Sequence, residues 1–88
     1  MNEIREIIRQ HYFDWAKENN TSFDKLKDFT VPMLTEMYGL KISYATFRKV
    51  VSSKNKNYIP SQRTVGELLS FFNIPFVVKN GGIELVKP

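Results

Sequence analysis

The stretch TVPMLTEMYGLKISYATFRKVV, residues 30–51, determines the fold of this 88-residue chain. Thr30 precedes an apolar pattern in which Pro32 occupies the first turn of a helix, where its missing N–H costs no hydrogen bond. Gly39 can take the left-handed conformation that ends this helix. After a short connection, Ser43 is a good N-cap for a second helix. The stretch therefore predicts two short helices joined at a turn.

The apolar residues of both helices recur at helical spacing, which marks the sides that face a core. The inward positions are Met33, Leu34, Met37 and Tyr38 in the first helix, and Tyr44, Phe47, Val50 and Val51 in the second. The outer face of the second helix has small, polar and basic side chains: Ala45, Thr46, Arg48, Lys49, Ser52 and Ser53. Tyr44 stands at the border of this face, where packing inside is favoured over a place against sugar and phosphate.

Three further helices are predicted from the same spacing. The first lies near the start of the chain, and its inner stripe is Ile4, Ile7, Ile8, His11, Tyr12 and Trp15. The charged residues between them, expected on the polar side, are Glu3, Arg5, Glu6, Arg9 and Asp14. Thr21 or Ser22 can cap a short helix whose inner residues are Phe23, Leu26 and Phe29. Thr64 and Glu67 have the spacing of a capping box, which predicts a fifth helix that ends near Asn73. Its inner stripe is Val65, Leu68, Leu69 and Phe72.

The end of the chain predicts a β-hairpin at about residues 75–87. Asn80-Gly81 is a strong signal for a two-residue turn between strands. In that register one face of the hairpin carries four apolar side chains: Phe76, Val78, Ile83 and Leu85. A lone hairpin is marginal in water, so this face is expected to pack on the helices or on another subunit. Residues 1–88 are therefore predicted to form a single, mainly α domain: a five-helix helix-turn-helix domain with a C-terminal β-hairpin.

Positive charge is concentrated in one window of the sequence. Residues 37–66 contain six Lys and Arg and no Asp or Glu, whereas the rest of the chain contains seven basic and nine acidic residues. The net charge of +4 therefore divides into +6 in the window and −2 outside it. A local positive field attracts polyanions, because each Lys or Arg that neutralises a phosphate releases condensed counterions. A merely solvated charged face is the other interpretation of such a run.

The order of these pieces resembles the helix-turn-helix of Cro-like and lambda-repressor-like regulators, which are common in phages and plasmids. The resemblance covers roughly residues 30–73, with the motif itself at about residues 30–53. Residues 33–40, MLTEMYGL, are similar to the first motif helix and its turn, and residues 43–51, SYATFRKVV, to the recognition helix. Counted from Gly39, the apolar positions of the second helix fall about two residues later than is usual in the family, which predicts a longer turn. Thr35 stands where the family often has a smaller residue.

The resemblance implies a sequence-specific transcriptional regulator, of repressor type, that binds double-stranded DNA as a homodimer on a pseudo-palindromic site. Its recognition helix would begin at Ser43 and enter the major groove. The residues expected to contact DNA are Ser43, Tyr44, Thr46, Arg48, Lys49, Ser52, Lys54, Lys56 and Arg63. Arg48 can bridge O6 and N7 of guanine, whereas the basic residues after the helix would contact phosphates at the edge of the footprint.

Two other binding functions remain open. The main alternative is a protein-interaction module, such as an antitoxin or an inhibitor of a nucleic-acid enzyme, whose basic face meets an acidic partner. RNA binding comes third, because Phe76 is the only aromatic residue in the hairpin. A sheet that stacks RNA bases usually carries several exposed aromatic side chains. The hairpin could also be a DNA-contacting wing, but only Lys79 and Lys87 favour this, so packing or dimerisation is the preferred role.

Catalysis, metal binding and a cofactor are not expected. His11 is the only histidine and cysteine is absent, so a nucleophile has no oriented base and a metal ion has no ligand set. Met33 and Met37 are predicted core residues by their spacing. The longest apolar runs are short and no signal peptide is visible. The chain is therefore expected to be a cytoplasmic, nucleoid-associated protein with no membrane partner.

Overall fold

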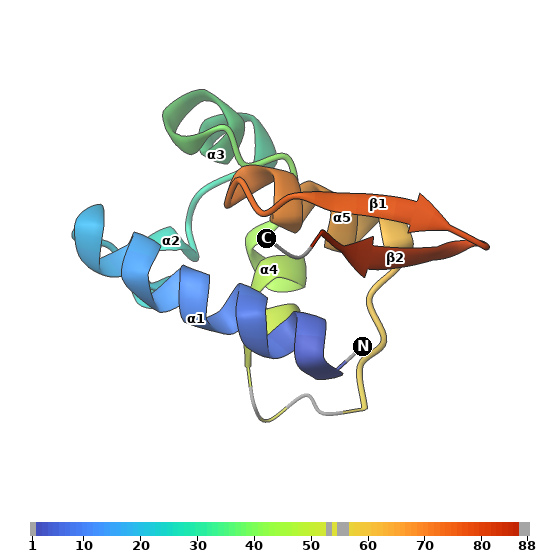
Figure 1. Ribbon diagram of the computed structural model, residues 1–88. Helices are drawn as coiled ribbons and strands as arrows, with labels where there is room; N and C mark the ends of the chain where they lie inside the picture. Colours follow the sequence, from blue (N-terminus) through green and yellow to red (C-terminus); the bar gives the residue numbers. More distant parts are fainter. Residues whose placement is uncertain (1, 53, 55–56, 87–88) are drawn as a thin grey trace.

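The computed structural model describes residues 2–52, 54 and 57–86. The elements follow in the order α1 (Asn2–Glu18), α2 (Phe23–Leu26), α3 (Val31–Tyr38), α4 (Tyr44–Val51), α5 (Gln62–Phe71), β1 (Phe76–Lys79) and β2 (Gly82–Leu85). The chain is mainly helical and ends in a two-stranded antiparallel hairpin (Figure 1). The predicted fold class, five helices followed by a C-terminal β-hairpin, is confirmed.

Hydroxyl side chains begin four of the five helices. The four N-caps have extended backbones, and each side chain accepts a hydrogen bond from the backbone N–H three residues later: Ser22, Thr30, Ser43 and Ser61. These bonds satisfy N–H groups that the start of a helix otherwise leaves unpaired. The predicted capping box at Thr64 is wrong, because the Thr64 N–H itself donates to Ser61 Oγ over 3.2 Å. Thr64 therefore lies inside the first turn of α5.

Phe47 of α4 lies at the centre of the core. Its side chain has no exposed surface. Five other aromatic rings have centroids 5.3–6.4 Å from its own, and they belong to Tyr12, Trp15, Phe23, Phe71 and Phe72. These rings come from α1, α2 and the end of α5, so α4 joins three parts of the chain. The predicted inner face of α4 is confirmed, since Val50 and Val51 are also buried.

The inner stripe predicted for α1 is largely confirmed, with His11 the clearest exception. Ile8 and Tyr12 are buried, and Trp15 packs against the core. His11 is exposed, with its Nδ1 2.8 Å from the carbonyl oxygen of Ile7. Its ring centroid lies 6.0 Å from that of Phe72. His11 therefore sits at the border of the apolar stripe rather than inside it.

The helix α3 lies at the edge of the molecule (Figure 1), and its predicted inner face is only half correct. Leu34 is fully buried and Tyr38 is half-buried against the core, but Met33 and Met37 are 42% and 57% exposed. The prediction that both methionines are core residues is therefore wrong. A helix of eight residues at the edge presents one narrow stripe to the core, formed by residues four apart such as Leu34 and Tyr38. Each methionine lies one position before a residue of this stripe and therefore points away from the core.

The connection between α3 and α4 occupies residues 39–43 and carries part of the core. Gly39 has a φ of 78° and donates its N–H to the Thr35 carbonyl over 2.9 Å, which ends α3 as predicted. The hydroxyl of Thr35 lies 2.9 Å from the carbonyl oxygens of both Val31 and Leu40, so it links the helix to the connection. Leu40 has no exposed surface. The connection therefore contributes an apolar side chain to the core.

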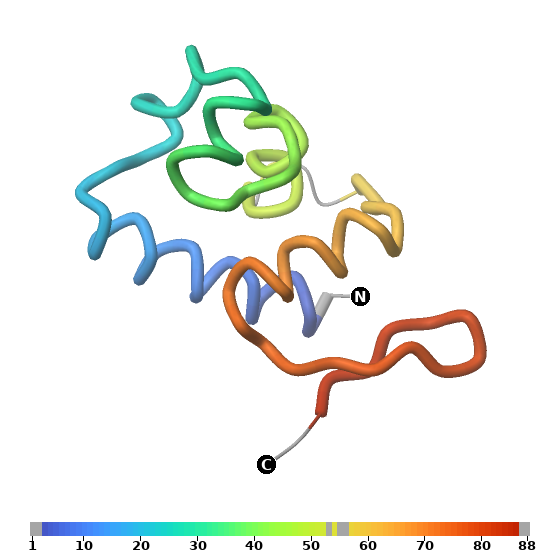
Figure 2. Tube along the Cα trace, turned by 90° about the horizontal axis from the view of Figure 1, so that it is seen from above, coloured from blue at the N-terminus to red at the C-terminus, as the bar shows by residue number. Residues whose placement is uncertain are grey.

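The hairpin has the predicted register, with Phe76 opposite Leu85 and Val78 opposite Ile83. Asn80 has a φ of 50° at the turn, as the Asn-Gly signal requires. Three of the four apolar side chains pack against the core, whereas Val78 is 64% exposed at the far end of the face. Seen from above, the hairpin lies on the far side of α1 and α5 from α4 (Figure 2). The hairpin thus completes the core at a distance from α4.

Candidate nucleic-acid interface

The outer side of α4 carries exposed charge on a rigid support. Phe47 and Val50 are buried on one side, while Ala45, Arg48 and Lys49 are exposed on the other. In the part of the chain that the structure describes, neither Arg48 nor Lys49 has a carboxylate oxygen within 4 Å. Both positive charges are therefore available to a partner.

The first turn of α4 is ordered by its own side chains. Ser43 Oγ accepts from the Thr46 N–H over 3.2 Å and donates to Thr46 Oγ1 over 3.0 Å, so these two half-buried hydroxyls are engaged with each other. Tyr44 packs against the core, as favoured from the sequence, and its ring centroid lies 6.1 Å from that of Phe23. The Tyr44 hydroxyl accepts a 3.1 Å hydrogen bond from Arg48 Nη1. Tyr44 thus orients the exposed guanidinium of Arg48.

The other predicted contact residues are spread over three segments. Lys49 Nζ lies 5.7 Å from the centroid of the Tyr58 ring, a distance at which the ring face attracts the cation. Ser52 caps the end of α4, and its Oγ accepts a 3.2 Å hydrogen bond from the Lys54 N–H. Arg63 is exposed in the first turn of α5. Lys56 lies outside the described residues.

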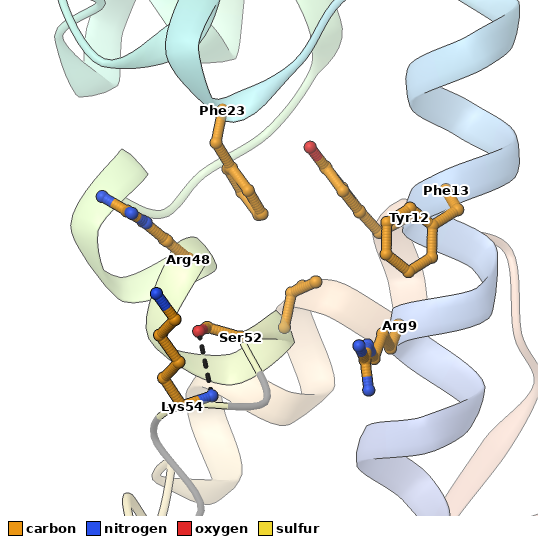
Figure 3. Close-up of a pocket in the computed structure, with 8 residues that line it drawn as sticks. Arg9, Tyr12, Phe13, Phe23, Arg48, Ser52 and Lys54 are labelled. Carbon is orange, nitrogen blue, oxygen red and sulfur yellow. Dashed lines mark hydrogen bonds between the residues drawn. The ribbon is translucent and has the colours of Figure 1, made fainter.

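A groove of about 280 Å³ runs between α1 and α4 (Figure 3). The described residues that line it are Arg9, Tyr12, Phe13, Phe23, Arg48, Val51, Ser52 and Lys54. Three of the predicted contact residues, Arg48, Ser52 and Lys54, meet here, whereas Thr46, Lys49 and Arg63 are not among these lining residues. Residues from α1 and α2 complete the groove.

The floor of the groove is aromatic. The rings of Tyr12 and Phe23 are stacked, with centroids 4.3 Å apart and planes 7° apart. Burial raises the pKa of the Tyr12 hydroxyl above its ordinary value, so this hydroxyl is neutral at physiological pH. Phe13 is 55% exposed at the rim, and the guanidinium carbon of Arg9 lies 5.8 Å from the centroid of its ring. The groove therefore combines an apolar floor with basic residues along its edges.

Arg5 of α1 holds the end of α4 in place. Its Nε and Nη2 donate to the carbonyl oxygens of Val50 and Lys49, each over 3.2 Å, and its Nη1 donates to the carbonyl oxygen of Tyr58 over 3.1 Å. The last carbonyls of a helix lack partners within the helix, and they carry the negative end of its dipole. A guanidinium at this point satisfies them and offsets that partial charge. Arg5 also ties the helix to the segment that follows it.

The helical pattern of α1 assigns Arg5 and Arg9 to the polar side, and the structure differs at both. Each follows directly after an apolar residue of the inner stripe, Ile4 or Ile8, and the two arginines are one turn apart. Both therefore lie at the border of the stripe, on the side that faces α4. The four-residue spacing of two arginines beside an apolar stripe is the only signal in the sequence, and a solvated helix face shows the same spacing.

Comparisons of the chain with protein-family models, curated proteins and solved structures find no match. Among the described residues, no cluster of three or more His, Cys, Asp or Glu is placed to hold a metal ion. None of the described helices combines the length and the apolar character needed to cross a membrane. The function must therefore be argued from the geometry and charge of α4 and the groove.

Proposed function

We propose that this chain is a sequence-specific DNA-binding regulator of transcription that places α4 in the major groove of double-stranded DNA. The observation that supports the proposal is the exposed side of α4, where Arg48 and Lys49 have no carboxylate partner among the described residues. They belong to a window of 30 residues that contains no Asp or Glu. Such a surface suits a polyanion, because each Lys or Arg that neutralises a phosphate releases a counterion condensed on the nucleic acid.

The dimensions of α4 suit this role. An α-helix with its side chains is about 10–12 Å in diameter, and the major groove, about 12 Å wide, admits it. Phe47 and Val50 anchor the opposite side of the helix in the core, so its exposed side chains are presented on a fixed support. Ala45 is small and exposed, which allows the backbone to come close to base edges.

The exposed residues divide into two proposed roles. Arg48, oriented by the Tyr44 hydroxyl, reads guanine through O6 and N7. Lys49, Lys54 and Arg63 contact phosphates, which fix the register of the protein on the duplex without reading sequence. A homodimer on a pseudo-palindromic site would place two such helices about 34 Å apart.

Replacing Arg48 with Ala is expected to reduce sequence preference strongly and to leave thermal stability nearly unchanged. Loss of one bidentate base contact costs about 1–3 kcal/mol of discrimination, and Arg48 is exposed, so the core is not affected. The measurement is a competition titration with two duplexes, one selected from a random library by the parent chain and one random. Lys17→Ala removes an exposed cation from α1 and is the matched control. Equal discrimination by Arg48→Ala and the parent would exclude Arg48 from base reading.

A protein-interaction module is the competing function, and the same titration separates the two. A chain that binds an acidic protein partner would use the same exposed cations. It would show no preference among DNA sequences. If the parent chain binds the selected and the random duplex equally, the proposal is wrong and the basic side of α4 must serve another partner.

A further inference from the structure

We infer that the groove between α1 and α4 receives the phosphodiester backbone beside the major groove, and that Arg9 of α1 is a phosphate contact. This inference rests on the proposed function and extends it to a helix outside the motif. Three elements supply the cations at the groove: Arg9 from α1, Arg48 from α4 and Lys54 from the segment after α4 (Figure 3). No carboxylate is among the described residues that line the groove. Its charge is therefore complementary to an anionic strand.

Among the described residues, Glu6 is the one carboxylate within 4 Å of these cations, and it is a weak competitor. Glu6 Oε1 lies 3.5 Å from Arg9 Nη1, and the Glu6 side chain is 62% exposed. Exposed ion pairs of this kind contribute little, because solvent screens them and the side chains lose freedom. Arg9 can therefore exchange this carboxylate for a phosphate at small cost, while its own 35% exposed side chain keeps one edge toward the groove.

The end of α4 would repel a phosphate if its carbonyls were bare, because it carries the negative end of the helix dipole. Arg5 removes this obstacle, since its guanidinium binds the carbonyl oxygens of Lys49 and Val50. Ser52 then offers a donor at the same place. Its Oγ accepts from the Lys54 N–H, which leaves its hydroxyl hydrogen available for a phosphate oxygen.

The apolar part of the groove suits a nucleic-acid strand better than an isolated anion. Phe13 is 55% exposed beside Arg9, and the floor is formed by the stacked rings of Tyr12 and Phe23. Deoxyribose can lie on such a surface while the adjoining phosphates meet the cations at the rim. Arg48 belongs both to the groove and to the exposed side of α4, so a strand in the groove continues directly from a duplex on α4.

The test is Arg9→Gln, measured with the selected and the random duplex over a range of salt concentrations. We expect affinity for both duplexes to fall by the same factor, about three- to tenfold at low salt, as for loss of one phosphate contact. The slope of log affinity against log salt should decrease in magnitude by about 0.9. Lys17→Gln makes the same charge change at an exposed position of α1 that does not line the groove, and it should leave the slope unchanged. Melting curves show whether both variants remain folded.

Each other outcome has a distinct meaning. An unchanged slope in Arg9→Gln, or an equal decrease in Lys17→Gln, overturns the inference and leaves the proposed function standing. A change in the preferred sequence on loss of Arg9 also overturns it, because a phosphate contact does not read bases. If the parent chain itself shows no preference or no salt dependence, the proposed function fails and the inference fails with it.

Discussion

Phe47→Ala will lower the free energy of unfolding by about 3–5 kcal/mol, which is the cost of a large cavity in a packed core. Phe47 has no exposed surface, and it is the meeting point of aromatic rings from α1, α2 and the end of α5. The surrounding rings are held by separate elements, so they cannot close the space together. Small domains have a total stability of only about 5–15 kcal/mol. The variant should therefore lose a large fraction of its stability, and near the lower end of that range it would be barely folded or loosely packed at room temperature.

Denaturant unfolding followed by circular dichroism measures this loss. Phe13→Ala is the matched control, because it removes the same side chain from a position that is 55% exposed, and it should change stability by about 0.5 kcal/mol or less. If Phe47→Ala unfolds at the same denaturant concentration as the parent, the orientation of α4 is wrong. The assignment of Arg48 and Lys49 to an outer face would then be wrong as well.

Arg5→Ala will cost about 2–3 kcal/mol of stability and will weaken DNA binding without changing the preferred sequence. Three carbonyl oxygens lose a charged donor, and one hydrogen bond to a charged group contributes about 1.5–3 kcal/mol net of water. These carbonyls are only partly buried or exposed, so water reaches them in the variant and the total loss stays near that of one such bond. Two of these carbonyls end α4 and the third belongs to Tyr58. The end of α4 and the segment that carries Lys54 should therefore lose their fixed position relative to α1.

Unfolding curves measure the loss of stability. Amide hydrogen exchange across residues 48–58 measures how far the end of α4 and the segment after it are loosened. Arg5→Lys should restore less than half of the lost stability, because one ammonium group cannot reach three carbonyls as a planar guanidinium does. Arg9→Ala, one turn further along α1, should leave stability nearly unchanged, since its ion pair is with the exposed Glu6 and exposed pairs contribute little. Parent-like unfolding and exchange in Arg5→Ala would show that α4 is held by its apolar side alone.

Much of the fold follows from local signals in the sequence. Ser43 and Gly39 set the start of α4 and the end of α3, and Asn80-Gly81 sets the register of the hairpin. Each of these depends on the conformational preference of one or two residues, which neighbouring elements do not override. The boundaries of both helices and the register of the hairpin could therefore be predicted closely.

The predictions were wrong where the place of an element in the folded molecule determines which of its side chains are buried or which residue caps it. Met33 and Met37 have the spacing of an inner face, but α3 lies at the edge of the molecule and only Leu34 and Tyr38 reach the core. Ser61 replaces Thr64 as the cap of α5, because both residues fit a hydroxyl cap and only the backbone path after Pro60 selects between them. Periodicity alone cannot show which side of a short helix its neighbours will cover.

The candidate site was predicted on α4 and missed on α1. The charge window identified Arg48 and Lys49, because a run without carboxylates leaves its cations unpaired at short range. The groove and the Arg5 contacts depend on the packing of α1 against α4 and the segment after it, between residues as far as 53 positions apart. No local pattern in the sequence records that packing, so Arg5 and Arg9 resemble ordinary solvated residues.

The central claim is that α4 reads double-stranded DNA, and the most direct test is a titration of the unmodified chain with duplex DNA at two salt concentrations. The selected duplex and a random duplex of equal length are compared at about 50 and 200 mM salt. We expect a steep loss of affinity with salt for both duplexes, together with a preference of about 10³-fold or more for the selected one. Equal affinity for the two duplexes, or binding that does not respond to salt, would contradict the claim.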